Sequence, residues 1–120
     1  MWLAMSKRYC LALDLKDDPQ LIAEYEAHHR RVWPEILESI RNSGIRSMEI
    51  YRLHTRLMMV MEVAGDFSFE RKAAADRGDP RVQAWESLMW KYQQAIPGGA
   101  SGSKWQLMEK IFELPGPSVS

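Results

Sequence analysis

The 120-residue sequence contains a single cysteine, Cys10, and its 16 lysine and arginine residues are balanced by 16 aspartate and glutamate residues. One cysteine excludes an internal disulfide framework and a cysteine-based zinc site, and it favours a reducing compartment such as the cytoplasm. A formal net charge of zero argues against nucleic acid or an anionic membrane surface as the partner, because both require a basic footprint. The same balance leaves little electrostatic repulsion between copies of the chain.

Long apolar runs are absent as well. No stretch approaches the roughly 18 consecutive apolar residues that a membrane-spanning helix needs. The first five residues are apolar, but the basic pair Lys7 and Arg8 follows them, whereas a signal peptide carries its charge in front. The length suits one domain. We therefore expect a single domain over residues 1–120, with a core from about 8 to 115 and flexible ends at 1–6 and 116–120.

Hydrophobic spacing predicts the order of the secondary-structure elements. The predicted elements are a strand at 9–15, a helical region at 19–42 interrupted at Trp33-Pro34, strands at 45–53 and 56–63, short helices starting at Asp66 and Asp79, and a strand at 105–114. This order, β-α-β-β-α-β, predicts an α+β fold of the ferredoxin-like sandwich type. Such a fold places helices on one face of a four-stranded antiparallel sheet.

Local signals mark the ends of the first helical region. Asp18 precedes Pro19, which is the chemistry of an N-cap followed by the first helical position. Pro34 lacks a backbone N–H and forces Trp33 toward extended geometry, so we expect the helix to break there. Gly44 suits the left-handed conformation that commonly ends a helix.

The first helical region carries the strongest candidates for chemistry. Tyr25, His29 and Trp33 are four residues apart, so on a continuous helix they would share one face. A histidine beside a tyrosine places a group that titrates near neutral pH next to a hydroxyl donor, which suits proton transfer. The same spacing is typical of an amphipathic helix whose aromatic side chains pack in a core. Spacing alone leaves both interpretations open.

A metal site is not expected. His28 and His29 are adjacent and therefore do not face each other, and a helical i, i+4 pair of histidines is absent. The third histidine, His54, falls in a predicted turn. A glycine-rich phosphate loop, a serine-centred elbow and a CxxC motif are absent too, so phosphoryl transfer and serine-type hydrolysis have no support.

Methionine and tryptophan stand out in the rest of the chain. Met89 continues the apolar stripe of the predicted helix that starts at Asp79, whereas Trp90 lies off that stripe and is expected to be exposed, to bind a partner or to line a cavity. Met48 lies on a predicted strand, where packing is the default role of methionine. The strand at Met58–Met61 is apolar on both faces, so a pocket or a second subunit must cover the face that the helices leave open.

The segment Tyr25–Glu35 resembles the Y-x-x-x-H-x-x-x-W-P-E signature of the L-rhamnose mutarotase family. Three further features agree in order and spacing: Gly44-Ile45 leading to Ile50-Tyr51, then Met89–Tyr92, then Phe112–Pro115. The resemblance extends from about Tyr9 to Pro115. It implies a fold of the dimeric α/β barrel type, in which the sheets of two ferredoxin-like subunits face each other as a homodimer. It also implies interconversion of the α and β anomers of a 6-deoxy sugar without a metal or organic cofactor.

The resemblance further implies roles for individual residues. The family's catalytic proton donor falls on His29, and its substrate-binding residues fall on Tyr25 and Trp90. Trp33 is expected to supply an apolar wall of the same site. The second proton-transfer group is left open among Glu109, Glu62 and water.

Two positions depart from the rhamnose pattern. Met48 stands where that pattern has a substrate-contacting tyrosine, and Met89 stands where it has the first of two tryptophans. Because a lost hydroxyl changes which sugar hydroxyls can be paired, the reaction type is better determined than the sugar. We expect an L-6-deoxyhexose as the monosaccharide substrate, with L-rhamnose first and L-fucose nearly level.

Two other functions are compatible with the same architecture, because a fold does not determine a function. A cofactor-free or heme-handling monooxygenase of the dimeric ferredoxin-like type would also use a histidine and tryptophans. Its oxygen dependence and, with heme, its absorbance spectrum would distinguish it from a mutarotase. A non-catalytic sensor would bind a sugar without exchanging its anomers.

Overall fold

The computed structural model describes residues 6–99 and 104–117. Its elements, in order, are β1 (Lys7–Leu15), α1 (Pro19–His29), α2 (Pro34–Asn42), β2 (Ile45–Leu53), β3 (Arg56–Val63), α3 (Phe69–Arg77), α4 (Pro80–Trp90), β4 (Gln93–Gln94) and β5 (Gln106–Leu107). This order confirms the predicted β-α-β-β-α-β arrangement, with each helical region divided into two helices. None of the described helices is long and apolar enough to cross a membrane.

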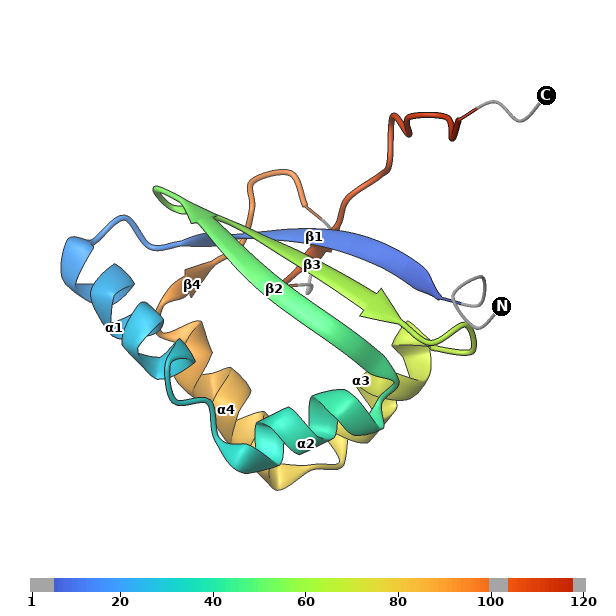
Figure 1. Cartoon of the computed structure of the whole chain (residues 1–120). Helices are drawn as coiled ribbons and strands as arrows, with labels where there is room; N and C mark the ends of the chain where they lie inside the picture. Colours follow the sequence, from blue (N-terminus) through green and yellow to red (C-terminus); the bar gives the residue numbers. More distant parts are fainter. Residues whose placement is uncertain (1–5, 100–103, 118–120) are drawn as a thin grey trace.

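The strands form one antiparallel sheet in the order β2-β3-β1-β4. β4 pairs with the end of β1 at Asp14 and Leu15, whereas β5 pairs with its middle at Leu11 and Ala12. These two short strands therefore share the fourth position of the sheet. The helices α1 to α4 all lie on one face of the sheet, and within the described residues no helix lies on the other face (Figure 1). The predicted ferredoxin-like sandwich is confirmed.

The helix starts follow the local chemistry predicted from the sequence. The Asp18 carboxylate accepts hydrogen bonds from the backbone N–H groups of Gln20 and Leu21, at 2.9 and 3.1 Å. These bonds satisfy N–H groups that have no partner within the helix. The break falls between the end of α1 at His29 and the start of α2 at Pro34. Gly44 has a φ of 95°, a conformation that glycine adopts without steric cost.

Two predicted elements differ from the structure. Ser68, not Asp66, is the N-cap of α3, because its hydroxyl accepts from the Arg71 N–H at 3.2 Å. The prediction of a strand at 105–114 was wrong beyond β5. The Met108 N–H still donates to the Cys10 carbonyl at 2.8 Å, but the chain then leaves the edge of β1 and runs away from the body (Figure 1). Without a neighbouring backbone, an apolar sequence does not form a strand.

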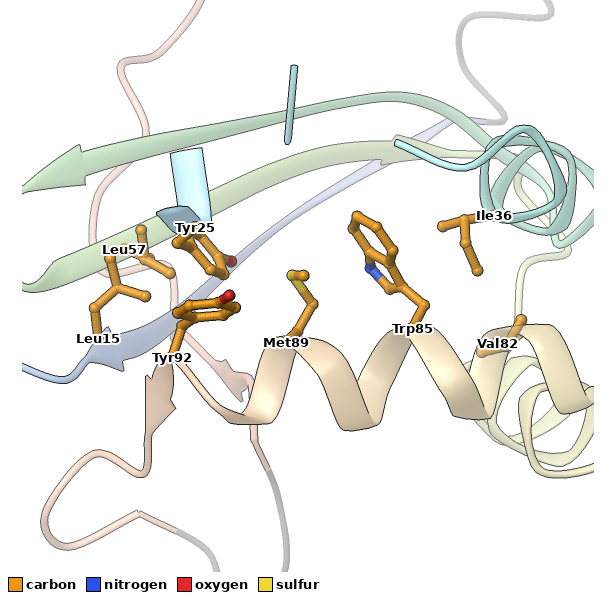
Figure 2. Close-up of a cluster of buried hydrophobic side chains, with 8 residues drawn as sticks. All are labelled: Leu15, Tyr25, Ile36, Leu57, Val82, Trp85, Met89 and Tyr92. Carbon is orange, nitrogen blue, oxygen red and sulfur yellow. The ribbon is translucent and has the colours of Figure 1, made fainter. Parts of the chain in front are cut away.

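The core lies between the sheet and the helices. Leu11, Leu13 and Leu15 alternate along β1 and are all buried, with Leu13 completely inaccessible. From the opposite side, α4 points Val82, Trp85 and Met89 toward the sheet (Figure 2). This spacing of three and four residues gives α4 one buried stripe. It also places Trp85 and Met89 on the side of α4 that faces α1 and the inner surface of the sheet.

Candidate active site

A cavity of about 900 Å³ lies between the helix-facing side of the sheet and the helices. Four of the residues singled out from the sequence line it: Tyr25 and His29 from α1, Met48 from β2, and Met89 from α4. Their elements are far apart in the chain, and the layer packing of the fold brings them together. The cavity is large enough for a monosaccharide, because small-molecule sites generally enclose about 300–1,000 Å³.

His29 is the last residue of α1, and its ring is partly buried in the cavity wall. Nδ1 lies 3.0 Å from the backbone carbonyl oxygen of Tyr25. A carbonyl oxygen only accepts hydrogen bonds, so Nδ1 carries the proton and the neutral ring keeps its lone pair on Nε2. The ring also packs against the rings of Tyr25 and Trp85, with centroid distances of 4.4 and 5.8 Å.

The surroundings of His29 favour its neutral form. Burial lowers the pKa of the imidazole, the hydrogen bond to the Tyr25 carbonyl partly offsets this effect, and His28 lowers the pKa further. An unperturbed histidine titrates at about 6.5, so His29 is predominantly neutral at pH 7. In this state Nε2 is able to accept a proton from a bound molecule.

Tyr25 is buried beside His29, with 3% of its surface exposed. The side-chain amide of Gln93 donates a hydrogen bond from Nε2 to the Tyr25 hydroxyl oxygen at 3.3 Å. Burial raises the pKa of Tyr25, and the bond from Gln93 offsets only part of this effect. The phenol therefore keeps its proton at neutral pH and acts as a hydrogen-bond donor rather than as an acid.

The two predicted tryptophans do not line this cavity. Trp33 packs its ring against Trp85 at a centroid distance of 5.1 Å, and the Arg81 guanidinium lies 4.3 Å from the Trp33 ring. Trp90 is 42% exposed. The Lys104 ammonium group lies 5.0 Å from the centre of the Trp90 ring, and Lys104 belongs to the cavity lining. Trp90 is therefore one side chain away from the cavity.

The lining residues that were not predicted as site candidates include Trp85, Gln93 and Trp105. Trp85 shares the apolar stripe of α4, and that pattern does not distinguish a cavity wall from an ordinary core position. Gln93 sits in a two-residue strand too short for any periodic signal. Trp105 precedes β5 and packs against both buried clusters of the core. Only the pairing of β4 and β5 with β1 brings Gln93 and Trp105 inward.

His28 has a different environment from His29, as expected for adjacent helical residues. Its Nε2 lies 3.2 Å from the Tyr92 hydroxyl, which donates its own proton to Glu24 at 3.1 Å. His28 must therefore donate from Nε2, which leaves its lone pair on Nδ1. This network ties α1 to the short segment between α4 and β4.

The carboxylates considered as a second proton-transfer group lie elsewhere. Glu62 forms an ion pair with Arg8 at 3.1 Å, and neither Glu62 nor Glu109 lines the cavity. Among residues 6–99 and 104–117, no three His, Cys, Asp or Glu side chains are grouped so that they could hold a metal ion. Neither of these two carboxylates is therefore part of the cavity wall.

Comparison with known proteins connects this chain to a family. The L-rhamnose mutarotase family model matches residues 8–114. The L-fucose mutarotase of Xanthomonas campestris pv. campestris is 51% identical over 110 residues, covering 90% of this chain and 88% of that protein. The L-rhamnose mutarotase of Paraburkholderia phymatum is 30% identical over 98 residues, covering 79% and 84%.

A solved structure agrees with the fold. The L-rhamnose mutarotase of Formosa agariphila superposes with a TM-score of 0.67 and covers 91% of this chain and 99% of its own. Its sequence identity to this chain is 19%, so the similarity bears on the architecture alone.

Proposed function

The chain belongs to the L-rhamnose mutarotase family, and from this premise we propose that it interconverts the α and β anomers of an L-6-deoxyhexose, with L-fucose preferred. The observation that carries the reaction is His29, a neutral imidazole in the wall of a sugar-sized cavity with its lone pair on Nε2. The preference for L-fucose is supported by the 51% identity to an L-fucose mutarotase, against 30% to an L-rhamnose mutarotase.

The proposed reaction needs two proton transfers and no change of oxidation state. His29 Nε2 removes the proton of the anomeric hydroxyl while the bond between C1 and the ring oxygen breaks and C1 becomes a carbonyl carbon. The ring oxygen takes up a proton, from water or from the protonated His29. Rotation about the C1–C2 bond presents the other face of the carbonyl, and the reverse transfers close the ring. General acid–base catalysis of this kind contributes roughly a hundred- to ten-thousandfold.

The other predicted site residues take supporting roles in this proposal. The buried Tyr25 hydroxyl donates to a sugar oxygen, and Met48 and Met89 supply apolar walls. Trp90 remains a predicted contact at the rim through Lys104. Trp33 acts from behind Trp85, whose position it supports.

The reaction is tested by saturation-transfer NMR, with purified protein offered L-fucose and L-rhamnose separately. We expect faster exchange of magnetisation between the anomers of both sugars, and the greater acceleration for L-fucose. Unchanged exchange of both sugars would contradict the proposed function. Sugar-dependent protection against thermal unfolding without exchange would then indicate a sensor.

The rate should depend on pH through His29. Only the neutral imidazole accepts a proton, so kcat/KM is expected to fall as His29 becomes protonated on acidification. Because burial lowers the pKa of His29, the acidic limb should lie below the ordinary histidine value of about 6.5. A pH series of NMR exchange rates tests this. A midpoint above 6.5 would contradict the proposed environment of His29.

We also propose that the enzyme is a homodimer through the open sheet face. The cross-strand pairs Ala12–Met58 and Cys10–Val60 lie on this face, since the neighbouring leucines of β1 point to the helices. In the described structure no helix covers it (Figure 1). The segment after β5 also exposes Ile111, Phe112 and Leu114 by 74–89%. A second copy would bury both apolar surfaces.

Met58→Glu should weaken this dimer, because each copy would bury a carboxylate without a partner on the apolar sheet face. Light scattering is expected to give twice the chain mass of 13.9 kDa for the natural protein and a smaller mass for the variant. Ser87→Glu is the matched control, since it adds the same charge at an exposed position of α4. A monomeric natural protein would contradict the proposal.

Cys10 is a free cysteine. Its free thiol supports placing the activity in the cytoplasm.

A further inference from the structure

Among the described residues, Gln93 is the only polar or charged residue that is buried, with 5% of its surface exposed. It is the first residue of β4 and pairs with Leu15 of β1, so its side chain faces the helices and lines the cavity. Burying an amide is costly unless its polar atoms find partners. The burial of a glutamine at this position therefore requires a structural or functional explanation.

The amide of Gln93 is only partly used by the protein. A glutamine offers two N–H donors and a carbonyl oxygen that accepts two hydrogen bonds. The structure occupies one donor, in the bond from Nε2 to the Tyr25 hydroxyl oxygen. No hydrogen bond between described residues uses the carbonyl oxygen Oε1, and no buried side-chain polar atom among them is left unpaired. Oε1 therefore keeps some exposed surface, and Gln93 is one of the residues that line the cavity.

The same bond orients Tyr25. Since the Tyr25 oxygen accepts from Gln93, the hydroxyl proton must point elsewhere. The two side chains together offer a bound molecule one donor, the Tyr25 O–H, and one acceptor, the Gln93 carbonyl. Both groups are buried and come from different elements, α1 and β4, so their positions are set by the packing of the fold.

The cavity wall also includes apolar side chains, among them Met48 and Met89. A sugar hydroxyl that meets the donor and acceptor is paired, whereas one that points at a methionine loses its water without replacement. L-fucose and L-rhamnose differ in the configuration of the hydroxyls at C2 and C4. We infer that Gln93, acting with Tyr25, is a specificity-determining residue that favours L-fucose over L-rhamnose; this inference rests on the proposed mutarotase function.

The test compares Gln93→Met with Gln94→Met. Gln93→Met keeps the length of the side chain and removes the amide, and Gln94 is the exposed neighbour in β4 that pairs with Asp14 on the other face. We expect Gln93→Met to lower kcat/KM for L-fucose by about ten- to a hundredfold. The loss for L-rhamnose should be smaller, so the ratio of the two kcat/KM values should fall by about tenfold. Gln94→Met should leave that ratio unchanged.

Two further variants separate a specific role from a structural one. In a Tyr25→Phe background the additional effect of Gln93→Met on sugar preference should be much smaller, because residues that act as one unit are not additive. If thermal unfolding shows that Gln93→Met does not fold, Gln93→Asn applies the same criterion, since it keeps the amide but withdraws it by one methylene.

The possible outcomes separate failure of this inference from failure of the proposed mutarotase function on which it rests. A natural protein that accelerates neither sugar would overturn both. An active natural protein, together with a folded Gln93 variant whose sugar preference changes by less than about twofold, would overturn the inference alone. A tenfold fall in the ratio that is confined to Gln93→Met would support it.

Discussion

His29→Ala is expected to lower the acceleration of anomer exchange by about a hundred- to ten-thousandfold. The reason is local, because His29 is the cavity-lining histidine whose neutral tautomer exposes a basic nitrogen. Met48 and Met89 offer no basic atom in its place, and the raised pKa of Tyr25 makes it a poor acid. Saturation-transfer NMR with L-fucose measures the loss.

The control for His29→Ala is His54→Asn. His54 lies in the turn between β2 and β3 with a φ of 52°, and asparagine tolerates this conformation better than alanine does. Its side chain is 71% exposed. We expect the control to keep full activity and both variants to keep a cooperative unfolding transition. Near-normal exchange in a folded His29→Ala variant would remove His29 from the mechanism.

Trp85→Ala is expected to cause the largest loss of stability, about 3–5 kcal/mol in the free energy of unfolding. The Trp85 ring is 9% exposed and packs against the rings of Trp33 and His29. Its removal leaves a void between α4, α1 and the start of α2. For a domain of this size the melting temperature should fall by roughly 10 °C or more, which calorimetry measures.

Trp90→Ala is the matched comparison, since it removes the same side chain from the same helix. Trp90 is 42% exposed, so its removal should change the free energy of unfolding by less than about 1 kcal/mol. If Trp90 contacts the sugar at the rim, KM should rise while the melting temperature is unchanged. Equal destabilisation by both variants would contradict the difference in burial between Trp85 and Trp90.

Much of the fold is readable from the sequence because its signals are local. The N-cap at Asp18, the helix break at Pro34 and the turn at Gly44 depend on hydrogen bonds and dihedral angles within a few residues. Such interactions form wherever those residues occur in that order. The position of the α3 cap differed by two residues, since Asp66 and Ser68 are both good caps and only the chain path selects Ser68.

The same distinction between local signals and long-range packing applies to the candidate site. The four-residue spacing of Tyr25 and His29 in a helix is local, so the sequence predicts that their rings lie together, and the structure places their centroids 4.4 Å apart. The helix break at Pro34 turns Trp33 away from that register and onto Trp85. The spacing of four residues could therefore not place Trp33 correctly.

The sequence by itself determined the order of the elements, the ends of the first helical region, the family and the pair formed by Tyr25 and His29. Tertiary structure alone decided that β4 and β5 share the fourth position of the sheet, and that Gln93 and Trp105 turn into the cavity. Contacts within a helix or turn span about four residues and are encoded locally. By contrast, Gln93 lies 68 residues after Tyr25, so their contact exists only once α1 and β4 have both packed against the sheet.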